Sequence, residues 1–404
     1  MNILQITNYG CAPLSANDNT GINRVVTALC GHFLSAYDYN CFNAYYTENP
    51  SGLSESFKGG MKMDYPFDNE AFRRYLTENQ IDIVVINVSN LAYVKEIPRI
   101  NEVAHVCKAK TVYCIHFIPG YETRTYFDSR MLYFNVAHGI KAMDSLKKAA
   151  VAYSRPLSSA IIKRMIRSRY GRPLETSDAV AVFADSYIDQ YLDFARSDRR
   201  DKFAVIPNPL PFRDGIDAES LADKKKEVLV VGRLYEPQKR LRYAFEVWKM
   251  IEQDPGFDDW KLLVVGDGAS RKYYEWLVRK MGLKNVQFCG SQNPRPFYQR
   301  ASILLSTSAY EGWPMVLMEC MPMGVVPCVF NSYAASGIII DHNVNGMIAP
   351  DNDLDSFCHC LKELMSDEHK RIRMAGAAVE KSESFESGII GDLWRKLFER
   401  LIQN

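Results

Sequence analysis

The sequence lacks any uninterrupted apolar run close to the ~18–20 residues that a transmembrane helix needs. Its start, MNILQI, enters a strand pattern directly, without the charged and apolar regions of a secretory signal. Strong charge of either sign is also missing, because the formal net charge is +1, and this argues against bulk nucleic-acid binding. These absences predict a cytoplasmic protein with no nucleic-acid partner.

The sequence also lacks a convincing metal-binding pattern. Its ten cysteines are scattered with no C-x-x-C pair, which is typical of small core residues in a reducing compartment. Cys358 and Cys360 lie close together, but they point to different sides of a helix and have no matching second pair. The acidic stretch DNDLD at 351–355 precedes a helical pattern, so a helix N-cap at Asp351 or Asp353 explains it better than a metal site. We therefore expect no metal and no cofactor.

What the sequence does contain is a regular alternation of short apolar runs and longer helical patterns. With 404 residues, 47% of them hydrophobic and 24% charged, the chain is globular in composition and too long for one ordinary core. Continuous apolar strands that alternate with helices predict parallel sheets covered on both faces, the doubly wound α/β class. The expected strands are 3–9, 81–88, 111–117, 179–184, 203–207, 228–234, 261–265, 286–289, 303–306 and 325–330.

The alternation breaks once, at a proline-rich and then polar stretch, so we expect two Rossmann-like domains. The first domain would span 1–207, a linker 208–226, and the second domain 227–385. The amphipathic segment 386–404 would either cap the second domain or cross back to the first. Ligands of such sheets bind beyond the carboxyl ends of the strands, so the informative residues should directly follow strands.

The loop GRLYEPQKR follows one of these strands and places Gly232, Arg233 and Lys239 at its carboxyl end. Glycine allows the backbone to approach a ligand closely, and the two cations can neutralise a polyanion such as a diphosphate. The alternative is an ordinary turn with solvated charges, because basic residues are common in loops.

The next strand is followed by GDGASRK, which begins like a dinucleotide-binding fingerprint. Arg271 stands where the third glycine of G-x-G-x-x-G belongs, and no G-x-x-x-x-G-K-[ST] occurs anywhere. A dehydrogenase and a P-loop NTPase are therefore disfavoured. The stretch Gly266–Gly268 is better interpreted as a tight turn beside a nucleotide pocket.

The stretch AYEGWPMVLMECMPMG carries two carboxylates around a predicted helix start. Pro314 suits the first turn of a helix that runs to about Met321, whose unpaired N–H groups could hold phosphate or sugar oxygens. Glu311 precedes this helix and should face the ligand cleft. Glu319 lies within the helix, where a carboxylate could accept hydrogen bonds from a ribose diol. The alternative, a solvated glutamate beside a core helix, fits Glu319 poorly because its neighbours are apolar.

These motifs together resemble one known family. EGWPMVLME matches the E-x7-E signature of the GT-B fold retaining glycosyltransferases of family 4, and VVGRL…QKR, LLVVGDG, NVQFCG, VIPNP and DHNVNGMIAP also match it from Val205 to Pro350. DNTGINRVV and VYCIHF resemble the first half of the family. The resemblance implies two Rossmann-like domains facing across a sugar-nucleotide cleft. It also implies a metal-independent hexosyltransferase that moves a sugar, with retention, from a nucleotide diphosphate to an acceptor hydroxyl.

The resemblance also implies roles for individual residues. Arg233 and Lys239 would hold the donor diphosphate, with Arg240 as an alternative to Lys239 because the spacing of the two cations is six rather than the commoner five. Glu319 would bind the ribose, and Glu311 the donor sugar.

Further donor-site residues follow from the same resemblance. Gly21 would open a loop near the phosphates, and His116 would lie beside the donor sugar. The residues that would cradle sugar, phosphate or base through close backbone approach are Gly232, Gly312, Trp313, Pro314, Met315, Val316, Gly290 and Ser291.

A basic segment, residues 141–172, holds nine basic residues against one acidic residue. It would lie on the anionic inner face of a membrane or receive a polyprenyl diphosphate, or else form an ordinary helix of the first domain. The predicted partners are a UDP-sugar, with a GDP-sugar next, and a saccharide or polyprenyl-linked acceptor in bacterial surface polysaccharide biosynthesis.

Two alternative functions stay open. A sugar-nucleotide epimerase of the same fold would need acid and base carboxylates around the sugar, whereas the chain offers mainly Glu311 there. A non-catalytic two-domain binding protein would have no use for two cations aimed at a diphosphate.

Overall fold

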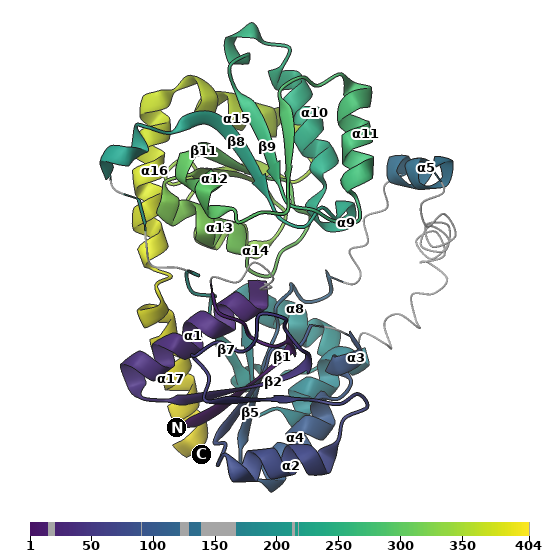
Figure 1. Ribbon diagram of the computed structural model, residues 1–404, viewed down its shortest axis with the longest axis vertical. Helices are drawn as coiled ribbons and strands as arrows, with labels where there is room; N and C mark the ends of the chain where they lie inside the picture. The colour runs from purple at the N-terminus through teal and green to yellow at the C-terminus, as the bar shows by residue number, and fades with distance from the viewer. Residues whose placement is uncertain are drawn as a thin grey trace. The chain divides into compact units, whose positions relative to one another are not determined.

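The structure of the chain, a computed structural model, describes residues 1–14, 21–89, 91–121, 129–138, 167–211, 215–216 and 218–403. The chain divides into two compact units (Figure 1). The first unit contains Met1–Gly120, Ile161–Arg213 and Phe385–Asn404, and the second contains Tyr121–Ala160 and Asp214–Ser384.

The first unit is built on a seven-stranded parallel sheet with the order β3-β2-β1-β4-β5-β6-β7. Its apolar strands are buried on both faces, as in β4 (Ile83–Ile86), where all four residues are buried. The remaining strands are β1 (Asn2–Tyr9), β2 (Asn40–Thr47), β3 (Gly59–Lys62), β5 (Lys110–Cys114), β6 (Ala179–Val182) and β7 (Phe203–Val205).

Helices cover both faces of this first sheet (Figure 1). The helix α2 (Asn69–Glu78) begins where the side chain of Asp68 accepts hydrogen bonds from two free backbone amides. It packs against α4 (Ile97–Val106). The other helices are α1 (Gly21–Tyr37), α3 (Leu91–Val94), residues 167–176, α8 (Asp185–Ala195) and α17 (Ser387–Gln403).

The last helix, α17, belongs to the first unit. It packs along α1, with the rings of Phe33 and Phe398 5.9 Å apart. The hydroxyl of Tyr37 also donates a hydrogen bond to Asp392 at 2.8 Å. Of the two placements that the amphipathic pattern allowed for 386–404, the structure has the one that crosses back.

The second unit is built on a six-stranded parallel sheet with the order β10-β9-β8-β11-β12-β13. The core lies between this sheet and its helices, where Trp248 and Phe357 are fully buried. The strands are β8 (Lys225–Val231), β9 (Lys261–Val265), β10 (Val286–Gly290), β11 (Ala301–Ser306), β12 (Val326–Asn331) and β13 (Met347–Pro350).

The helices of the second unit also fall on two sides of their sheet (Figure 1). On one side α10 (Leu241–Ile251) packs between α11 (Arg271–Met281) and α15 (Leu354–Ser366). The others are α5 (Ser129–Ala137), α9 (Glu236–Lys239), α12 (Arg295–Arg300), α13 (Met315–Cys320), α14 (Ala334–Ile339) and α16 (Glu368–Glu383).

One segment from the first half of the chain packs on the second unit. Phe134 of α5 is only 4% exposed, and its ring lies 5.6 Å from that of Tyr273 and 5.4 Å from that of Trp276. Arg130 forms an ion pair with Glu246. The expected first domain, 1–207, is therefore interrupted, because a short helix is stabilised by the apolar surface on which its aromatic residue is buried.

Three strands of the sheets were not expected from the sequence: β2, β3 and β13. The strand β2, NCFNAYYT, places a buried asparagine, Asn43, among apolar residues, and β3 and β13 have only four residues each. Neighbouring strands supply the pairing that these sequences do not signal, with Thr7 opposite Tyr45 and Val329 opposite Ile348.

Most of the basic segment 141–172 lies outside the described residues, and its last part, 167–172, is helical. Within the described part of the chain, no helix has both the length and the apolar character to cross a bilayer. The expected contact of this segment with a membrane thus stays a prediction.

Candidate functional site

The loop after β8 is held against the loop after β9 by close backbone contact. Gly232 has a φ of 138°, and its carbonyl group approaches Gly266 so closely that a Cβ there would lie 2.0 Å from the Gly232 oxygen. Only glycine tolerates this approach and this backbone conformation. The tight turn expected at Gly266–Gly268 therefore serves the packing of two loops, rather than a dinucleotide fingerprint.

Two of the predicted charged residues, Lys239 and Glu311, form an ion pair. Nζ of Lys239 lies 2.7 Å from Oε1 of Glu311, and the side chains are 16% and 11% exposed. The lysine also covers the turn, since a Cβ at Gly232 would lie 3.3 Å from its Cε. Two hydrogen bonds fix α9 to the loop after β11. Thr307 Oγ1 donates to the carbonyl oxygen of Lys239 at 2.8 Å, and the amide of Ala309 donates to the carbonyl oxygen of Gln238 at 2.7 Å.

Arg233 joins the same cluster through a residue that the sequence did not single out. Its Nη2 donates to Oε1 of Gln238 at 3.2 Å, and its guanidinium lies 5.4 Å from the ring centre of Tyr235. Nε2 of Gln238 donates in turn to Oε2 of Glu311 at 3.2 Å. The sequence signal that could have indicated Gln238 is its position directly before Lys239 in the loop motif.

Arg240, the alternative to Lys239 for the donor diphosphate, points into the core instead of lining the hollow. It is 1% exposed, and its Nη2 lies 2.7 Å from Oδ1 of Asp351 and 3.1 Å from the Ser308 carbonyl oxygen. A left-handed backbone (φ 47°) at the C-cap of α9 accompanies this inward direction. Arg240 therefore holds the loop after β11 from within.

The acidic stretch at 351–355 is also accounted for by local structure. Asp353 caps α15, accepting a hydrogen bond from the Ser356 amide at 3.0 Å, as an N-cap should. Asp351 pairs with the buried Arg240. Among the described residues, no group of three or more His, Cys, Asp or Glu side chains could hold a metal ion.

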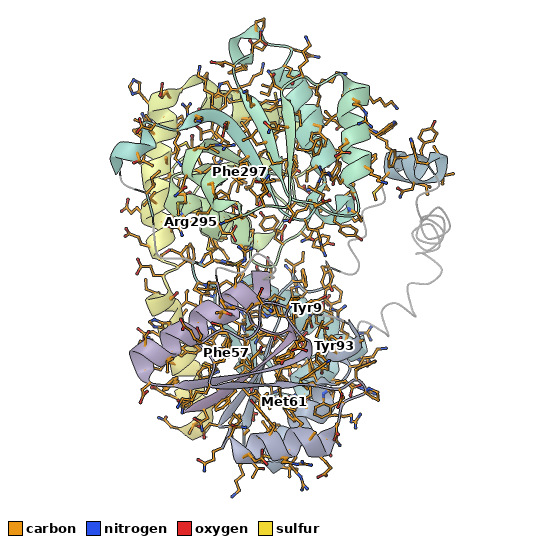
Figure 2. All side chains as sticks on the ribbon, viewed as in Figure 1. Tyr9, Phe57, Met61, Tyr93, Arg295 and Phe297 are labelled. Carbon is orange, nitrogen blue, oxygen red and sulfur yellow. The ribbon has the colours of Figure 1, made fainter. Side chains whose placement is uncertain are left out.

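Glu319 is a buried carboxylate with a specific partner. It lies on α13, is 2% exposed, and its Oε2 accepts a hydrogen bond from the hydroxyl of Tyr298 at 2.9 Å. Tyr298 is fully buried on α12, whose Arg295 and Phe297 are labelled in Figure 2. Nothing in the local sequence could have shown this pairing, because the two residues are 21 positions apart and on different helices.

The helix α13 begins close to where the sequence predicted. Pro314 is its N-cap, and Met315 and Val316 are its first residues, with Gly312 and Trp313 buried just before them. The helix ends at Cys320, one residue before the expected end. The proposed contacts of these backbone groups with sugar or phosphate stay predictions.

A small hollow, open to solvent, lies at the carboxyl ends of β8 and β11. It brings together residues that the sequence places more than 80 positions apart, which is the expected ligand position in such a sheet. Its lining is Val230, Val231, Gly232, Arg233, Leu234, Lys239, Leu241, Leu304, Leu305, Ser306, Thr307, Ser308 and Val316.

Gly290 and Ser291 were also predicted to contact the donor, and they lie at the end of β10, which pairs with β9. Gly290 ends β10 with a φ of 75°, and its carbonyl oxygen accepts a hydrogen bond from the Gly266 amide at 2.7 Å. Ser291 comes next and is exposed. Both therefore lie at the carboxyl edge of the sheet, where a planar base could meet backbone groups.

The remaining two predicted residues lie in the first unit. His116 follows β5, and its Nε2 lies 3.1 Å from Oδ1 of Asn87. Because Nδ2 of Asn87 donates to Oε1 of Gln5 at 2.8 Å, Oδ1 is the acceptor and Nε2 of His116 carries the proton. Burial lowers the pKa of His116 to about 4, so its ring is neutral at pH 7. Gly21 is the first residue of α1, and the loop before it, 15–20, lies outside the described residues.

His116 also lines a second small hollow at the carboxyl ends of β4 to β7. Asn208 and Trp394 contribute to it from the chain after β7 and from α17. In each unit, a hollow therefore lies at the edge where ligands of parallel sheets bind.

Comparison with known proteins gives a family match for the second unit. Residues 212–381 match the model of the glycosyl transferases group 1 family. An N-acetylgalactosaminyltransferase of Campylobacter jejuni that acts on an undecaprenol-linked saccharide is 27% identical over 54% of this chain and 59% of its own length. The lipopolysaccharide 1,6-galactosyltransferase of Salmonella typhimurium is 31% identical over 44% and 50%, so the chain spans about half the length of these relatives.

Solved structures are similar over the whole chain. Anabaena HepE in complex with UDP has a TM-score of 0.70 at 13% identity, covering 99% of this chain and 100% of its own. Sucrose-phosphate synthase of Thermosynechococcus elongatus has a TM-score of 0.71 at 16% identity, covering 100% and 99%. The fold of this protein is that of the GT-B glycosyltransferases, with two parallel-sheet Rossmann-like domains.

Proposed function

We propose that this protein is a retaining glycosyltransferase of the group 1 type. It moves a sugar from a nucleotide-diphosphate donor to an acceptor hydroxyl without a metal ion. The observation that carries the proposal is that Arg233 and Lys239 line one hollow at the carboxyl ends of β8 and β11, with Glu311 paired to Lys239 beside it. This arrangement lies within the residues that match the family.

The cations act on the leaving group. As the bond between the anomeric carbon and the phosphate oxygen lengthens, negative charge grows on the nucleoside diphosphate. Lys239 is only 16% exposed, so its charge acts where little water screens it and stabilises this developing charge strongly. Glu311 pairs with Lys239, so a donor diphosphate must share the lysine with it or take its place.

The transfer itself needs no separate general base. The acceptor hydroxyl oxygen forms the new bond to the anomeric carbon on the face from which the diphosphate departs. The electron pair of the broken bond stays on the phosphate oxygen, which takes the hydroxyl proton. This step predicts that no side-chain substitution abolishes turnover by removing a base while donor affinity is kept.

The donor is a UDP-sugar, with a GDP-sugar as the next choice. Support comes from the UDP and UDP-glucose bound to Anabaena HepE. The acceptor is a saccharide or a polyprenyl-linked saccharide in bacterial surface polysaccharide biosynthesis, as in the undecaprenol-linked substrates of two relatives. The protein then works at the inner face of the membrane.

The test is thermal unfolding of the purified protein with UDP-, GDP- and ADP-sugars, with and without EDTA, in the wild type and in Glu319→Ala. A ligand of the folded state raises the midpoint in a concentration-dependent way. We expect one nucleotide class to stabilise the wild type, EDTA to change nothing, and the variant to lose the response. Glu363→Ala is the matched control, since Glu363 lies on α15 and pairs only with Lys370 among the ion pairs of the described residues.

Transfer is tested next by the release of nucleoside diphosphate with an undecaprenyl-linked saccharide, and by the anomeric configuration of the product. Retained configuration supports the proposal, and inverted configuration contradicts its mechanism. An epimerised sugar nucleotide without transfer would favour the epimerase. Absence of stabilisation by every sugar nucleotide would remove the proposal and favour a binding protein for another ligand.

A further inference from the structure

Gln238 connects Arg233, which lines the hollow, to Glu311 through one buried amide. Its Oε1 accepts a hydrogen bond from Nη2 of Arg233 at 3.2 Å. Its Nε2 donates to Oε2 of Glu311 at 3.2 Å and to the carbonyl oxygen of Tyr310 at 3.4 Å. The residue is only 5% exposed, and its backbone carbonyl accepts the Ala309 amide. Both ends of the amide are therefore engaged inside the protein.

The neutrality of this amide matters for what Arg233 can do. Arginine pairs strongly with a carboxylate, often through two parallel hydrogen bonds. If Arg233 were held by a carboxylate, a phosphate would have to compete with an ion pair. Because Gln238 stands between Arg233 and Glu311, the guanidinium is oriented by a neutral acceptor and keeps its charge for a phosphate.

The same amide also orients the carboxylate. Oε1 of Glu311 accepts from Lys239 at 2.7 Å, and Oε2 accepts from Gln238 at 3.2 Å. Two donors, one on each oxygen, fix the plane of the carboxylate better than one donor can. The carboxylate that would meet the donor sugar is thus aimed by two consecutive residues of α9.

We propose that Gln238 is a positioning residue that aligns Arg233 for the donor diphosphate and Glu311 for the donor sugar at the same time. This inference rests on the proposed function and deepens it. Gln238 acts through its two partners and needs no contact with the substrate. It couples the phosphate part of the site to the sugar part through a single side chain.

Two substitutions separate the two ends of the amide. Gln238→Glu keeps an acceptor for Arg233 but makes it an ion-pair partner and removes the donor to Glu311. We expect it to weaken UDP binding about tenfold or more, because a charged hydrogen bond must be exchanged. Gln238→Met keeps the length and removes both hydrogen bonds. We expect UDP affinity to change by about threefold or less, while kcat falls about tenfold because Glu311 loses one donor.

The experiment uses the full chain, with UDP, GDP and ADP as calorimetric probes and release of nucleoside diphosphate from the matching sugar nucleotide as the measure of turnover. A double-mutant cycle joins Gln238→Met with Glu311→Gln. If Gln238 acts through Glu311, the loss in the double variant is close to that of the larger single loss rather than the product of both. Gln253→Met, at an exposed turn of the same unit, is the control and should combine with Glu311→Gln multiplicatively.

Multiplicative losses in the Gln238→Met cycle, or unchanged UDP affinity in Gln238→Glu, would overturn the positioning role. If Gln238→Met does not fold, the UDP affinity of Gln238→Glu alone decides whether Gln238 positions its partners. The unfolding midpoint of Gln238→Glu, compared with that of the wild type, shows that this variant is folded. If the wild type binds none of the three probes, the proposed function fails instead. If the wild type binds and the glutamate variant binds equally, only the role of Gln238 fails.

Discussion

The two units contain the same kind of parallel sheet but place different chemistry at the carboxyl ends of their strands. In the first unit, His116 is neutral and forms a chain of uncharged hydrogen bonds with Asn87 and Gln5. In the second unit, Lys239 and Glu311 form a largely buried ion pair. The hollow of the second unit is therefore lined by two cations, Arg233 and Lys239, whereas that of the first unit is lined by uncharged polar and apolar side chains.

This difference also explains why only one unit was easy to interpret. Charged side chains are rarely buried without a reason, so a lysine and glutamates next to apolar runs attract notice in a sequence. Asparagine and glutamine within strands do not. A site can therefore be predicted from the sequence more readily when its side chains are charged than when they are neutral.

The largest expected effect comes from removing the charge of Lys239, one of the two cations that line the hollow of the second unit. Lys239→Ala should lower turnover about 100- to 1,000-fold, because a charge placed where the transition state becomes anionic is lost. The measurement is kcat/KM for release of nucleoside diphosphate from the sugar nucleotide. Lys226→Ala is the control, since its side chain is 55% exposed at the start of β8 and should change little. Equal losses in both variants would break the contrast between site and surface.

The next effect is the pH dependence of stability that follows from the neutral His116 in the first unit. The folded pKa of His116, about 4, lies below the ordinary value of 6.5, so the unfolded chain binds more protons between these two pH values. The stabilising contribution is complete above pH 6.5 and is lost as the pH falls toward 4, by at most about 3 kcal/mol.

His116→Gln should remove this part of the pH dependence while keeping a donor for Asn87. Denaturant unfolding at pH 7.5 and 4.5 measures the difference in the free energy of unfolding between the two variants. His359→Gln, at an exposed position of α15, should leave the wild-type slope intact. A wild-type slope in the His116 variant would show that the histidine is not buried neutral.

A smaller effect sharpens the role of the glycine turn in the second unit. Gly232→Ala places a Cβ 3.3 Å from Lys239 Cε on a backbone with φ 138°, so we expect a loss of about 1–3 kcal/mol of stability. Chemical denaturation measures it, and the fit of UDP should suffer as Lys239 is displaced. Gly337→Ala on α14 meets nothing within 4 Å and should be neutral or stabilising.

The smallest effect concerns the buried carboxylate of the second unit. Tyr298→Phe removes the hydroxyl that donates to Glu319 and should weaken nucleotide binding and stability by about 1–2 kcal/mol. Calorimetry with UDP and with 2′-deoxy-UDP separates the two roles. If Glu319 holds the ribose, the variant should lose affinity for UDP more than for the deoxy nucleotide. Equal losses would leave only a structural role for the tyrosine.

The alternation of apolar strands with helices was enough to predict the doubly wound class and ten strands. Strong periodicity in one stretch of chain is local information, and the chain carries it directly. The helix start at Pro314 was also predictable, because proline fixes a φ suited to the first turn of a helix. By contrast, β2, β3 and β13 depend on their neighbours in the sheet.

The candidate site divides in the same way. Gly232, Arg233, Lys239, Glu311 and Glu319 could be named from their residue types and their places after strands. Their partners could not be named, since no local pattern relates residues that meet only after folding.

Two positions show that division most clearly. Arg240 and Lys239 are adjacent cations, and only the fold decides that one enters the core beside Asp351 while the other faces the hollow. Likewise the segment around α5 carries no mark of the unit on which it packs, and α17 could have covered either sheet.

By itself the sequence determined the secondary structure class, the two sheets and the residue types of the loop that we propose binds a diphosphate. These depend on periodicity, backbone preferences and charge, which act over a few residues. The tertiary structure alone decided the ion pair of Lys239 with Glu311, the amide bridge of Gln238 and the placing of α5 and α17. The reason is that these contacts join residues that are distant in the chain, and complementary surfaces select them only when the whole core has closed.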